Sequence, residues 1–552
     1  MRHTLLLSTA LAAATSLQAQ GTDPRAVRMD SVFSAIDRTG TPGCAAGALQ
    51  DGRWLHARGY GMADLERGAP IMPSTVFYMG SVSKQFTAMS IALLARDGKL
   101  SLDDPARKYI PEIPEAGAGI TIRHMVHHTS GLREKWDLLL LSGFRSGNLV
   151  VQQDVLDLVK RQQALNFAPG TDYLYSNTAY DLLATVVHRA SGKSIREFAG
   201  ERIFRPLGMT RSLYLDDRTL MVPGRASGYS VARGKVSLDN PNVETVGSGS
   251  VYSTLEDMAR WDESFYTAAL GDQELLRLVQ TPGRLNDGTQ LTYAFGLTVD
   301  QWRGLKRVQH GGALAGFRTQ ITRFPDQHFS AIVLCNFGQA NPGNYADRIA
   351  EIFLGDKLTA AVARGWTPGE KPPFGDPALA ERARGIYRSG RSGDVVRLEP
   401  DGAALFYVMG GMRVPLSATA TDRARLPSPF DLDVAFELNG AGPALGFRQT
   451  GQPITQSFSR VDAAVVAAAA LAEVAGRYHS PELGVTWTVA LKDTSLVATV
   501  AGGRQVTWQP AFKDGFTAEG STVELSRDAR GRVTALLVTP GRSRNIRFDR
   551  VR

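Results

Sequence analysis

The sequence predicts an α+β domain, in which helices pack on an antiparallel sheet, followed by two antiparallel β-barrel-like domains. In residues 43–354, strand-like segments flank a mostly helical stretch, an order typical of an α+β domain. Beyond residue 375 the chain changes to short strands and turns, and this pattern repeats after about ninety residues. A chain of 552 residues is too long for one hydrophobic core, so several domains are expected.

The first domain begins with a predicted β-hairpin over residues 43–61, because Asp51-Gly52 separates two alternating segments. Apolar periodicity predicts helices at about residues 83–97, 151–163, 177–190 and 254–270. The last of these helices begins with Ser253-Thr-Leu-Glu256, which fits a capping box. Strands are expected again at about residues 293–336, with a turn at 324–327, and a final helix at about 342–354.

The helix over residues 83–97 carries one residue against the local preference. Its apolar stripe and its end at Asp97-Gly98 are ordinary; the stripe consists of Phe86, Met89, Leu93 and Leu94. Its first turn, however, holds Lys84, a cation at the positive end of the helix dipole, which costs up to ~1 kcal/mol. Lys84 therefore needs a chemical explanation.

Composition predicts the domain boundaries. A proline-rich segment without periodicity at residues 359–375 indicates a linker, and the alanine-rich segment at 463–470 indicates a second one. LAERARGIY (379–387) is similar to LAEVAGRY (471–478), and SFSRV (457–461) is similar to RFDRV (547–551). The repeat predicts two similar β domains in tandem. The predicted folded units are residues 20–358, 376–462 and 471–552.

Residues 1–19 have the features of a secretory signal peptide. Arg2 precedes an apolar run from Leu5 to Ala14, and Ala19 supplies a small residue at the cleavage position. The apolar run is too short for a membrane span, and no later segment is long enough either. We therefore expect a periplasmic or secreted protein with no integral membrane span.

The charge distribution gives no indication of a nucleic-acid partner. The net charge is +8, but lysines and arginines are spread along the chain beside acidic residues, with no basic run. No nucleic acid is therefore expected as a partner. The sequence leaves open whether the protein forms a homodimer.

The two cysteines, Cys44 and Cys335, lie at the start of one predicted strand and at the end of another. If these strands are antiparallel neighbours, the two sulfurs can meet. An exported protein encounters an oxidising compartment, which favours a disulfide bond. The alternative is a pair of buried, inert thiols.

Ser81 and Lys84 form an S-x-x-K motif within the sequence SVSK. Three positions along a helix place the two side chains one turn apart. A serine hydroxyl needs a neighbouring base to act as a nucleophile, and a lysine amine serves as that base only with a lowered pKa. Burial and a helix N-terminus both lower the pKa of a lysine, so the placement of Lys84 suits this chemistry.

Two further elements suit the same chemistry. Tyr175-Ser176-Asn177 lies at a loop-to-helix junction. A tyrosine beside a lysine ammonium is expected to have a lowered pKa and to act as a base, while Asn177 can orient Lys84 or a substrate carbonyl. The alternative is an ordinary core tyrosine followed by a helix cap. His310-Gly311-Gly312 falls on a strand, where glycines let a substrate backbone come close, although His310 alone could be a core histidine.

Together, these motifs resemble those of the penicillin-recognising serine hydrolases. The closest resemblance is to the class C β-lactamase-related group, which carries S-x-x-K, Y-x-N and [KH]-[TSG]-G in this order. ITIRHMVHHTSGL (120–132) and VGSGSVYSTLEDMARW (246–261) are also similar to segments of that group. The resemblance covers about residues 30–355. It implies a β-lactamase/transpeptidase-like domain, with helices on both faces of the sheet and a helical insert.

The resemblance also implies roles for individual residues. Ser81 would be the acylated nucleophile, and Lys84 and Tyr175 would share the proton transfers. The substrate-binding residues would be Asn177, His310, Gly312 and Ala313. The backbone N–H groups of Ser81 and Ala313 would form the oxyanion hole, in which each donor typically contributes ~3 kcal/mol to transition-state binding.

This chain differs from class C β-lactamases at His310, and the difference bears on the expected substrate. Class C β-lactamases carry a lysine where this chain has His310, and a largely neutral histidine does not favour a substrate carboxylate as a lysine does. H-x-G is similar to D-aminopeptidases and some esterases of the group. D-aminopeptidases of the group also have two C-terminal β-barrel domains, and a loop of the last one reaches toward the active site. The sequence does not identify that loop here.

The leading prediction is an exported serine hydrolase that forms a Ser81 acyl-enzyme and acts as an aminopeptidase or amidase on D-amino acid or small peptide substrates. Alternatives are a carboxylesterase or a β-lactamase of the same family, or a slowly turning-over penicillin-binding sensor or cell-wall-binding protein. No cofactor or metal is expected. The helical spacing of three histidines could suggest metal binding, but they fall in the family-like segment and are interpreted as structural: His124, His127 and His128.

Overall fold

A computed structural model of the chain describes residues 23–551, except residues 146, 233, 360–369, 410–411, 428–431, 452 and 464–467. The predicted signal peptide and most of the first predicted linker lie outside the described residues. None of the helices in the described ranges is long and apolar enough to cross a membrane.

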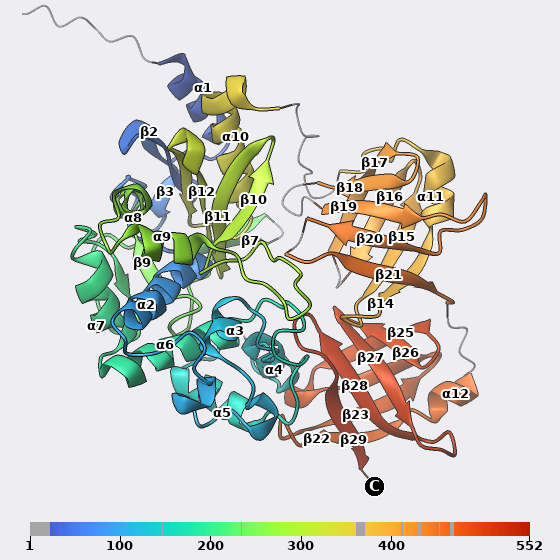
Figure 1. Ribbon diagram of the computed structural model, residues 1–552. Coiled ribbons are helices and arrows are strands. Elements are labelled where there is room, and N and C mark those ends of the chain that lie inside the picture. Colours follow the sequence, from blue (N-terminus) through green and yellow to red (C-terminus); the bar gives the residue numbers. More distant parts are fainter. Residues whose placement is uncertain are drawn as a thin grey trace, which may run out of the picture.

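A six-stranded antiparallel sheet, counted over the described residues, forms the centre of the N-terminal domain (Figure 1). Its strand order is β10-β11-β12-β13-β1-β2, so the last of these strands in the chain, β13, pairs with the first. The bounds are β1 (Cys44–Gln50), β2 (Arg53–Tyr60), β10 (Thr298–Trp302), β11 (Leu305–Leu314), β12 (Phe317–Phe324) and β13 (Phe329–Cys335). Asp51 and Gly52 take positive φ values of 49° and 71° in the β1–β2 turn, which confirms the predicted hairpin.

Helices cover both faces of this sheet, which confirms the predicted α+β architecture. Helices α1 and α10 enclose one apolar core with the sheet, and α2, α6 and α8 contribute to the larger core on the other side. The helix bounds are α1 (Pro24–Phe33), α2 (Lys84–Arg96), α3 (Ile122–Val126), α4 (Lys135–Leu141), α5 (Gln152–Arg161), α6 (Asn177–Ser191), α7 (Ile195–Ala199), α8 (Leu255–Thr267), α9 (Gln273–Gln280) and α10 (Pro342–Leu354). Short strands complete the domain: β3 (Met62–Asp64), β4 (Ala69–Pro70), β5 (Phe77–Tyr78), β6 (Leu213–Tyr214), β7 (Tyr229–Ala232), β8 (Lys235–Leu238) and β9 (Val251–Ser253).

The N-terminus of α8 differs from the predicted capping box. Thr254 is the N-cap, and its hydroxyl accepts a hydrogen bond of 3.0 Å from the backbone nitrogen of Asp257. Ser253 is instead the last residue of β9, where it pairs with Phe77. The N-cap therefore lies one residue later than predicted, because strand pairing holds Ser253 in β9.

In the described part of the chain, the C-terminal region forms two closed antiparallel barrels of eight strands each. The first comprises β14 (Gly385–Ser389), β15 (Val395–Asp401), β16 (Ala404–Met409), β17 (Met412–Ala420), β18 (Arg423–Leu426), β19 (Leu432–Glu437), β20 (Gly446–Thr450) and β21 (Gln456–Val461). The second comprises β22 (Gly476–Ser480), β23 (Val485–Lys492), β24 (Ser495–Thr499), β25 (Gln505–Phe512), β26 (Gly515–Ala518), β27 (Ser521–Arg527), β28 (Val533–Pro540) and β29 (Ile546–Val551). Short helices precede them: α11 (Pro377–Ala383) and α12 (Ala468–Ala472). This confirms the two predicted barrel-like domains.

The sequence repeat corresponds to the seam that closes each barrel. Tyr387 of β14 lies opposite Arg460 of β21, and Tyr478 of β22 lies opposite Arg550 of β29. Each tyrosine hydroxyl donates a 2.7 Å hydrogen bond to a backbone carbonyl four residues earlier. The repeated segments therefore comprise the short helix before each barrel, its first strand and its last strand, and the same tyrosine contacts recur at both seams.

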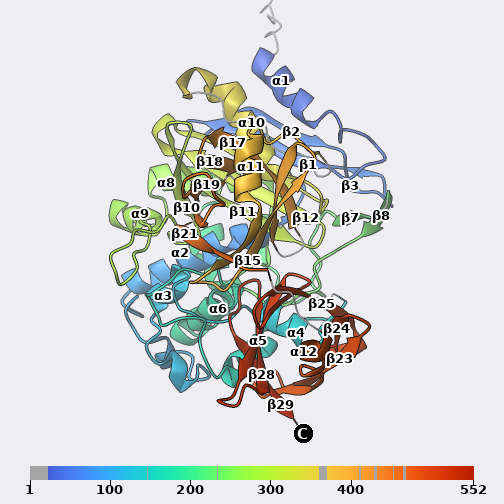
Figure 2. The ribbon, with the colours of Figure 1, turned by 90° about the vertical axis from the view of Figure 1, so that its right-hand side faces the viewer.

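The two barrels lie along one flank of the N-terminal domain, and the second barrel lies beside α4 and α5 (Figures 1 and 2). Leu138, Leu141 and Leu158 from these helices belong to the same apolar cluster as the core of the second barrel. Arg133 forms a buried ion pair with Glu482 across this interface. The second barrel is thereby attached to the domain by apolar contact and by charge.

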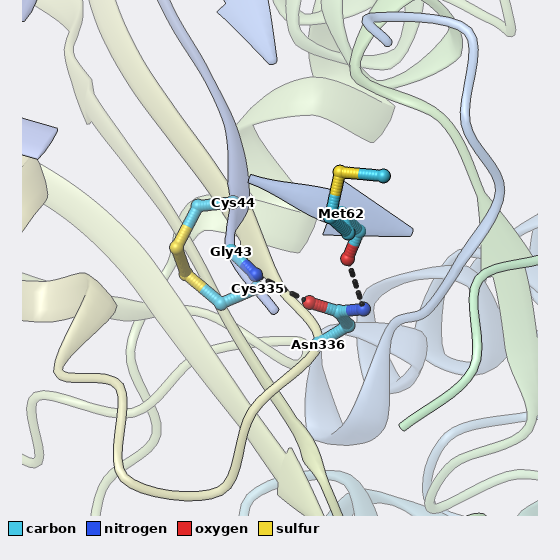
Figure 3. The surroundings of a disulfide bond; sticks show 5 residues. All are labelled: Gly43, Cys44, Met62, Cys335 and Asn336. Atoms are coloured by element: carbon cyan, nitrogen blue, oxygen red, sulfur yellow. Dashed lines mark hydrogen bonds between the residues drawn. A yellow bond between two sulfur atoms is a disulfide. The ribbon is translucent and has the colours of Figure 1, made fainter. Parts of the chain in front are cut away.

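A disulfide bond joins Cys44 and Cys335, which face each other on β1 and β13 (Figure 3). The antiparallel pairing that the sequence left open is therefore present, and both sulfurs are buried. Beside the bond, Asn336 accepts a hydrogen bond of 2.8 Å from the Gly43 nitrogen and donates one of 3.0 Å to the Met62 carbonyl. The disulfide thus fastens the first and last strands of the domain at one edge of its core.

Candidate active site

Ser81 and Lys84 lie side by side at the start of α2, although they do not share one α-helix as expected. Ser81 belongs to a 3₁₀ turn, Gly80–Ser83, and Lys84 is the first residue of α2. The two segments are continuous, so the predicted proximity is retained: Lys84 Nζ lies 3.2 Å from Ser81 Oγ. The predicted apolar stripe understates the burial of α2, since every residue from Lys84 to Leu94 is buried.

The Lys84 amine is enclosed by three oxygen atoms. Besides Ser81 Oγ, these are Asn177 Oδ1 at 2.7 Å and the Ser248 carbonyl oxygen at 2.8 Å. Burial holds the pKa of Lys84 well below its usual value, as expected from the sequence. A neutral amine has two hydrogens and one lone pair. With both hydrogens donated to Asn177 and Ser248, the lone pair is left for the Ser81 hydroxyl proton.

Tyr175 lies against the same amine, but its pKa is not lowered as expected. The ring centroid is 4.7 Å from Lys84 Nζ, and the phenol is hydrogen-bonded to Ser81. Burial nevertheless raises the pKa of Tyr175, because the phenolate would lose its solvation, and this effect exceeds the opposing hydrogen bond to Ser81 and the charge of Arg542. The geometry therefore presents a protonated phenol beside the serine, with Lys84 as the better placed base.

Asn177 is oriented by a residue that the sequence analysis did not select. Ser176 caps α6, with its hydroxyl 3.1 Å from the Ala179 nitrogen, so Asn177 begins the helix as predicted. The Glu134 carboxylate accepts hydrogen bonds from the Asn177 backbone nitrogen at 2.7 Å and from Nδ2 at 2.9 Å. With Nδ2 held there, Oδ1 faces Lys84. The sequence signal for Glu134 was its position two residues after the family-like segment 120–132.

Glu134 remains a carboxylate although it is fully buried. Burial by itself raises the pKa of Glu134, but the charge of Arg542 and the two hydrogen bonds from Asn177 bring it below the usual value. Its negative charge in turn opposes the lowering of the Lys84 pKa. Glu134 thus orients Asn177 and also influences the protonation of Lys84.

A second buried lysine supports the Ser248 carbonyl. Lys135 Nζ lies 2.6 Å from Asp181 Oδ2 and 2.8 Å from Thr245 Oγ1. The other Asp181 oxygen accepts a 3.0 Å hydrogen bond from the Ser248 nitrogen. This ion pair thus holds the backbone nitrogen of Ser248, the residue whose carbonyl accepts from Lys84, and Lys135 is itself paired with Asp181.

His310 lies on β11 with both ring nitrogens engaged. Nδ1 donates to the Gly311 carbonyl at 2.7 Å, which leaves Nε2 to accept from the Tyr293 hydroxyl at 3.0 Å. Burial, assisted by the charge of Lys84, lowers the pKa of His310 to about 4. His310 is therefore neutral near pH 7, as expected where the related group carries a lysine.

The predicted oxyanion-hole groups lie close together because two glycines permit it. A Cβ on Gly80, which has a φ of +54°, would lie 2.6 Å from the Ala313 nitrogen. A Cβ on Gly312 would lie 3.0 Å from the Ser81 nitrogen and 2.1 Å from the Met79 carbonyl oxygen. No side chain fits at either position, so the Ser81 and Ala313 nitrogens come near each other. Strand β10 pairs with β11 only up to Gln309, which leaves the following residues open to a substrate backbone.

A small pocket of about 50 Å³ opens beside Ser81. Its lining combines the predicted oxyanion-hole segment, Asn177 and aromatic side chains. The residues that line the pocket are Tyr78, Gly80, Ser81, Lys135, Trp136, Asn177, Val243, Thr245, Ser248, Gly249, Ala313 and Leu314. The pocket lies beside Ser81 and Ala313, where the acyl group of a substrate would be placed. The structure thus brings every predicted site residue into one cluster.

A loop of the second barrel reaches this cluster. It is the turn between β28 and β29, where the Arg542 nitrogen donates a 2.7 Å hydrogen bond to Asp137 Oδ2. The Arg542 guanidinium carbon lies 5.3 Å from the centroid of the Tyr175 ring. In the same turn, Arg544 forms a 2.9 Å ion pair with Asp172. No local pattern in the sequence distinguishes this turn from the other barrel turns, so only the fold could identify it.

The three histidines near residue 125 have structural partners. His124 accepts a 3.2 Å hydrogen bond from the Thr121 nitrogen at the start of α3, and His127 bonds to the Tyr293 carbonyl. His128 accepts a 3.1 Å hydrogen bond from the Ser176 nitrogen. Over the described ranges, no group of three or more histidine, cysteine or acidic residues is arranged to hold a metal ion.

Comparison with known proteins relates this chain to one family. Residues 29–355 match the Beta-lactamase family model. A D-aminopeptidase from Gluconobacter oxydans is 28% identical over 552 residues, which cover 96% of this chain and 100% of that protein. A D-aminopeptidase from Cereibacter sphaeroides is 28% identical over 466 residues, or 84% of each chain. Both relatives extend through the barrel region as well as the N-terminal domain.

Among solved structures, the octameric penicillin-binding protein homologue from Pyrococcus abyssi has a similar fold. The TM-score is 0.55 and the identity 20%, with 78% of this chain and 99% of that chain covered. At this identity the likeness concerns the fold alone.

Proposed function

Because the chain belongs to the beta-lactamase family and is a serine hydrolase, we propose that it is an exported aminopeptidase or amidase that acts on D-amino acid or small peptide substrates through a Ser81 acyl-enzyme. The observation that carries the proposal is the enclosed Lys84 amine, 3.2 Å from Ser81 Oγ, with Asn177 and Ser248 occupying its hydrogens. The preference for D-substrates is supported by the two D-aminopeptidase relatives.

The acylation step follows from this arrangement. Neutral Lys84 accepts the Ser81 proton as Oγ attacks the substrate carbonyl, and the resulting oxyanion is bound by the Ser81 and Ala313 nitrogens. The amide C–N bond then breaks, and the amine leaves with a proton from the Tyr175 phenol, which recovers one from Lys84. Water subsequently attacks the ester and loses a proton to Lys84. The bond to Ser81 Oγ then breaks, Lys84 returns the proton to Oγ, and the acid is released.

The neutral His310 and the small pocket support the substrate class. A neutral imidazole does not provide the cation that a lysine at this position would offer to a substrate carboxylate. The pocket beside Ser81 is bounded by neutral and paired side chains, as the uncharged acyl carbonyl of an amide requires, with Asn177 and Ala313 in its lining.

Export is supported by two features. Residues 1–19 have the composition of a signal peptide, and a disulfide between Cys44 and Cys335 is typical of proteins in oxidising compartments.

A substrate panel tests the proposal: D-alaninamide, L-alaninamide, p-nitrophenyl acetate and nitrocefin, each with the wild-type enzyme and with Ser81→Ala. We expect turnover of D-alaninamide to exceed that of the L-amide and of nitrocefin, and to be lost in Ser81→Ala. Ser90→Ala is the matched control, because the one hydrogen bond of the Ser90 hydroxyl within the described part of the chain goes to the Phe86 carbonyl in the same helix. Nitrocefin turnover above amide turnover would reassign the enzyme as a β-lactamase, and activity retained in Ser81→Ala would refute the nucleophile.

A further inference from the structure

The turn of the second barrel places a cation at the active site. Its backbone is fixed on both sides: the Arg542 nitrogen donates to Asp137 at 2.7 Å, and the Arg542 carbonyl accepts from Asn166 Nδ2 at 3.0 Å. The Glu134 nitrogen donates to Ser543 Oγ at 3.0 Å. These three hydrogen bonds to the N-terminal domain hold the turn, and with it the side chains of the turn, beside the site.

The N–H donors of the Arg542 guanidinium are not engaged by the described residues. Within the described residues it forms no hydrogen bond, and its nearest anion, Glu134 Oε1, is 3.9 Å away. Both Glu134 oxygens accept hydrogen bonds from Asn177, and the ion pair of Glu134 with Arg542 is too long for a hydrogen bond. The Arg542 side chain is 36% exposed. It therefore offers a planar set of donors to a solute that enters the site.

The other basic side chains described near Ser81 already have hydrogen-bond or ion-pair partners. Lys84 is enclosed by Ser81, Asn177 and Ser248, and Lys135 is neutralised by Asp181. His310 has both nitrogens bonded. An anionic substrate group would therefore bind Arg542 rather than His310 on β11.

Arg542 lies next to the side chain that is placed to protonate the leaving group. The guanidinium lies over the ring of Tyr175, 5.3 Å from its centroid, and Tyr175 is the phenol placed to protonate the departing amine. The small pocket beside Ser81, which would hold the acyl group, does not include Arg542 in its lining. The cation is thus near the end of the substrate that leaves first.

We propose that Arg542 is a specificity-determining residue that binds the free carboxylate of the leaving amino acid, so that the preferred substrates are D-aminoacyl dipeptides with an unblocked C-terminus. A guanidinium and a carboxylate form paired, charge-assisted hydrogen bonds that a neutral amide does not reproduce. This inference rests on the proposed function, because it names the substrate within that same site.

The test compares D-alanyl-glycine with D-alanyl-glycinamide, which differ only in the terminal carboxylate, by the release of D-alanine. We expect kcat/KM of the wild-type enzyme to be at least ten times higher for the free acid. In Arg542→Gln, the acid-to-amide ratio should fall about 10- to 100-fold, mainly through KM, and Arg542→Lys should recover part of it. Arg547→Gln is the matched control, since Arg547 is an exposed arginine of the same barrel paired with Asp549, and should keep the wild-type ratio.

The outcomes separate this inference from the proposed function. A wild-type enzyme that cleaves both dipeptides without preference, or an Arg542→Gln ratio within twofold of wild type, overturns the role of Arg542 alone. A wild-type enzyme that cleaves neither dipeptide nor D-alaninamide overturns the proposed function, and this inference with it. If Arg542→Gln does not fold, the wild-type ratio decides, because a carboxylate bound by a guanidinium requires the preference for the acid.

Discussion

Replacing Glu134 by glutamine should disable the site without removing any residue that contacts the substrate carbonyl. The Glu134 carboxylate accepts two hydrogen bonds from Asn177, at 2.7 Å and 2.9 Å. A glutamine has one acceptor oxygen, so its amide nitrogen would face one of the two Asn177 donors. Either Asn177 loses one bond, or its amide turns and presents Nδ2 to Lys84 in place of Oδ1, which now accepts at 2.7 Å.

The magnitude follows from the bond that is lost. A hydrogen bond to a charged group contributes about 1.5–3 kcal/mol. If the whole of this loss appears in transition-state binding, kcat/KM falls by about 10- to 150-fold. Glu134→Gln also removes a negative charge that raises the pKa of Lys84. The acidic limb of the pH profile of kcat/KM, which reports loss of the Lys84 proton, should therefore move to lower pH.

The assay is hydrolysis of D-alaninamide between pH 5 and 9, together with urea unfolding of each variant. Glu351→Gln is the control, because Glu351 is an exposed residue of α10, on the far side of the sheet from Lys84, and pairs there with Arg303 rather than with a residue of the site. A decrease below threefold together with an unmoved acidic limb would refute the positioning role of Glu134. A decrease that follows only the loss of folded protein would refute it as well.

Two further predictions concern stability. Burial and the charge of Glu134 raise the pKa of Asp137 to about 7, so the folded state binds a proton that the unfolded state releases near pH 4. The contribution of Asp137 to the free energy of unfolding is therefore complete below about pH 4 and is lost as the pH rises through 7. Urea unfolding between pH 5 and 8 should show a weaker decline of this free energy in Asp137→Asn than in the wild type. An unchanged decline would contradict this prediction. Replacing Cys44 and Cys335 together by alanine should lower the free energy of unfolding by about 2–5 kcal/mol, because the bond spans 291 residues; equal urea midpoints with and without the disulfide would contradict it.

The sequence determined the local chemistry of this protein. Periodicity and turn residues predicted the β1–β2 hairpin, the main helices and the two barrels, because these signals depend on neighbouring residues and on a repeat that the chain carries twice. The same holds for Ser81 and Lys84, whose proximity follows from three steps along one continuous helical segment. The Y-x-N and H-G-G motifs supplied the remaining candidate residues in the correct order.

The tertiary structure decided what depends on burial and on contacts between distant segments. The expected lowering of the Tyr175 pKa was wrong, because the loss of solvation in the folded core exceeds the effect of the neighbouring charges. Glu134 is recognised only once α6 places Asn177 over it, and Arg542 only once the second barrel docks on α4. Local patterns encode which groups are available. Their solvation and their distant partners are set by the packing of the domains, as between Asp137 and Arg542, which are 405 residues apart in the chain.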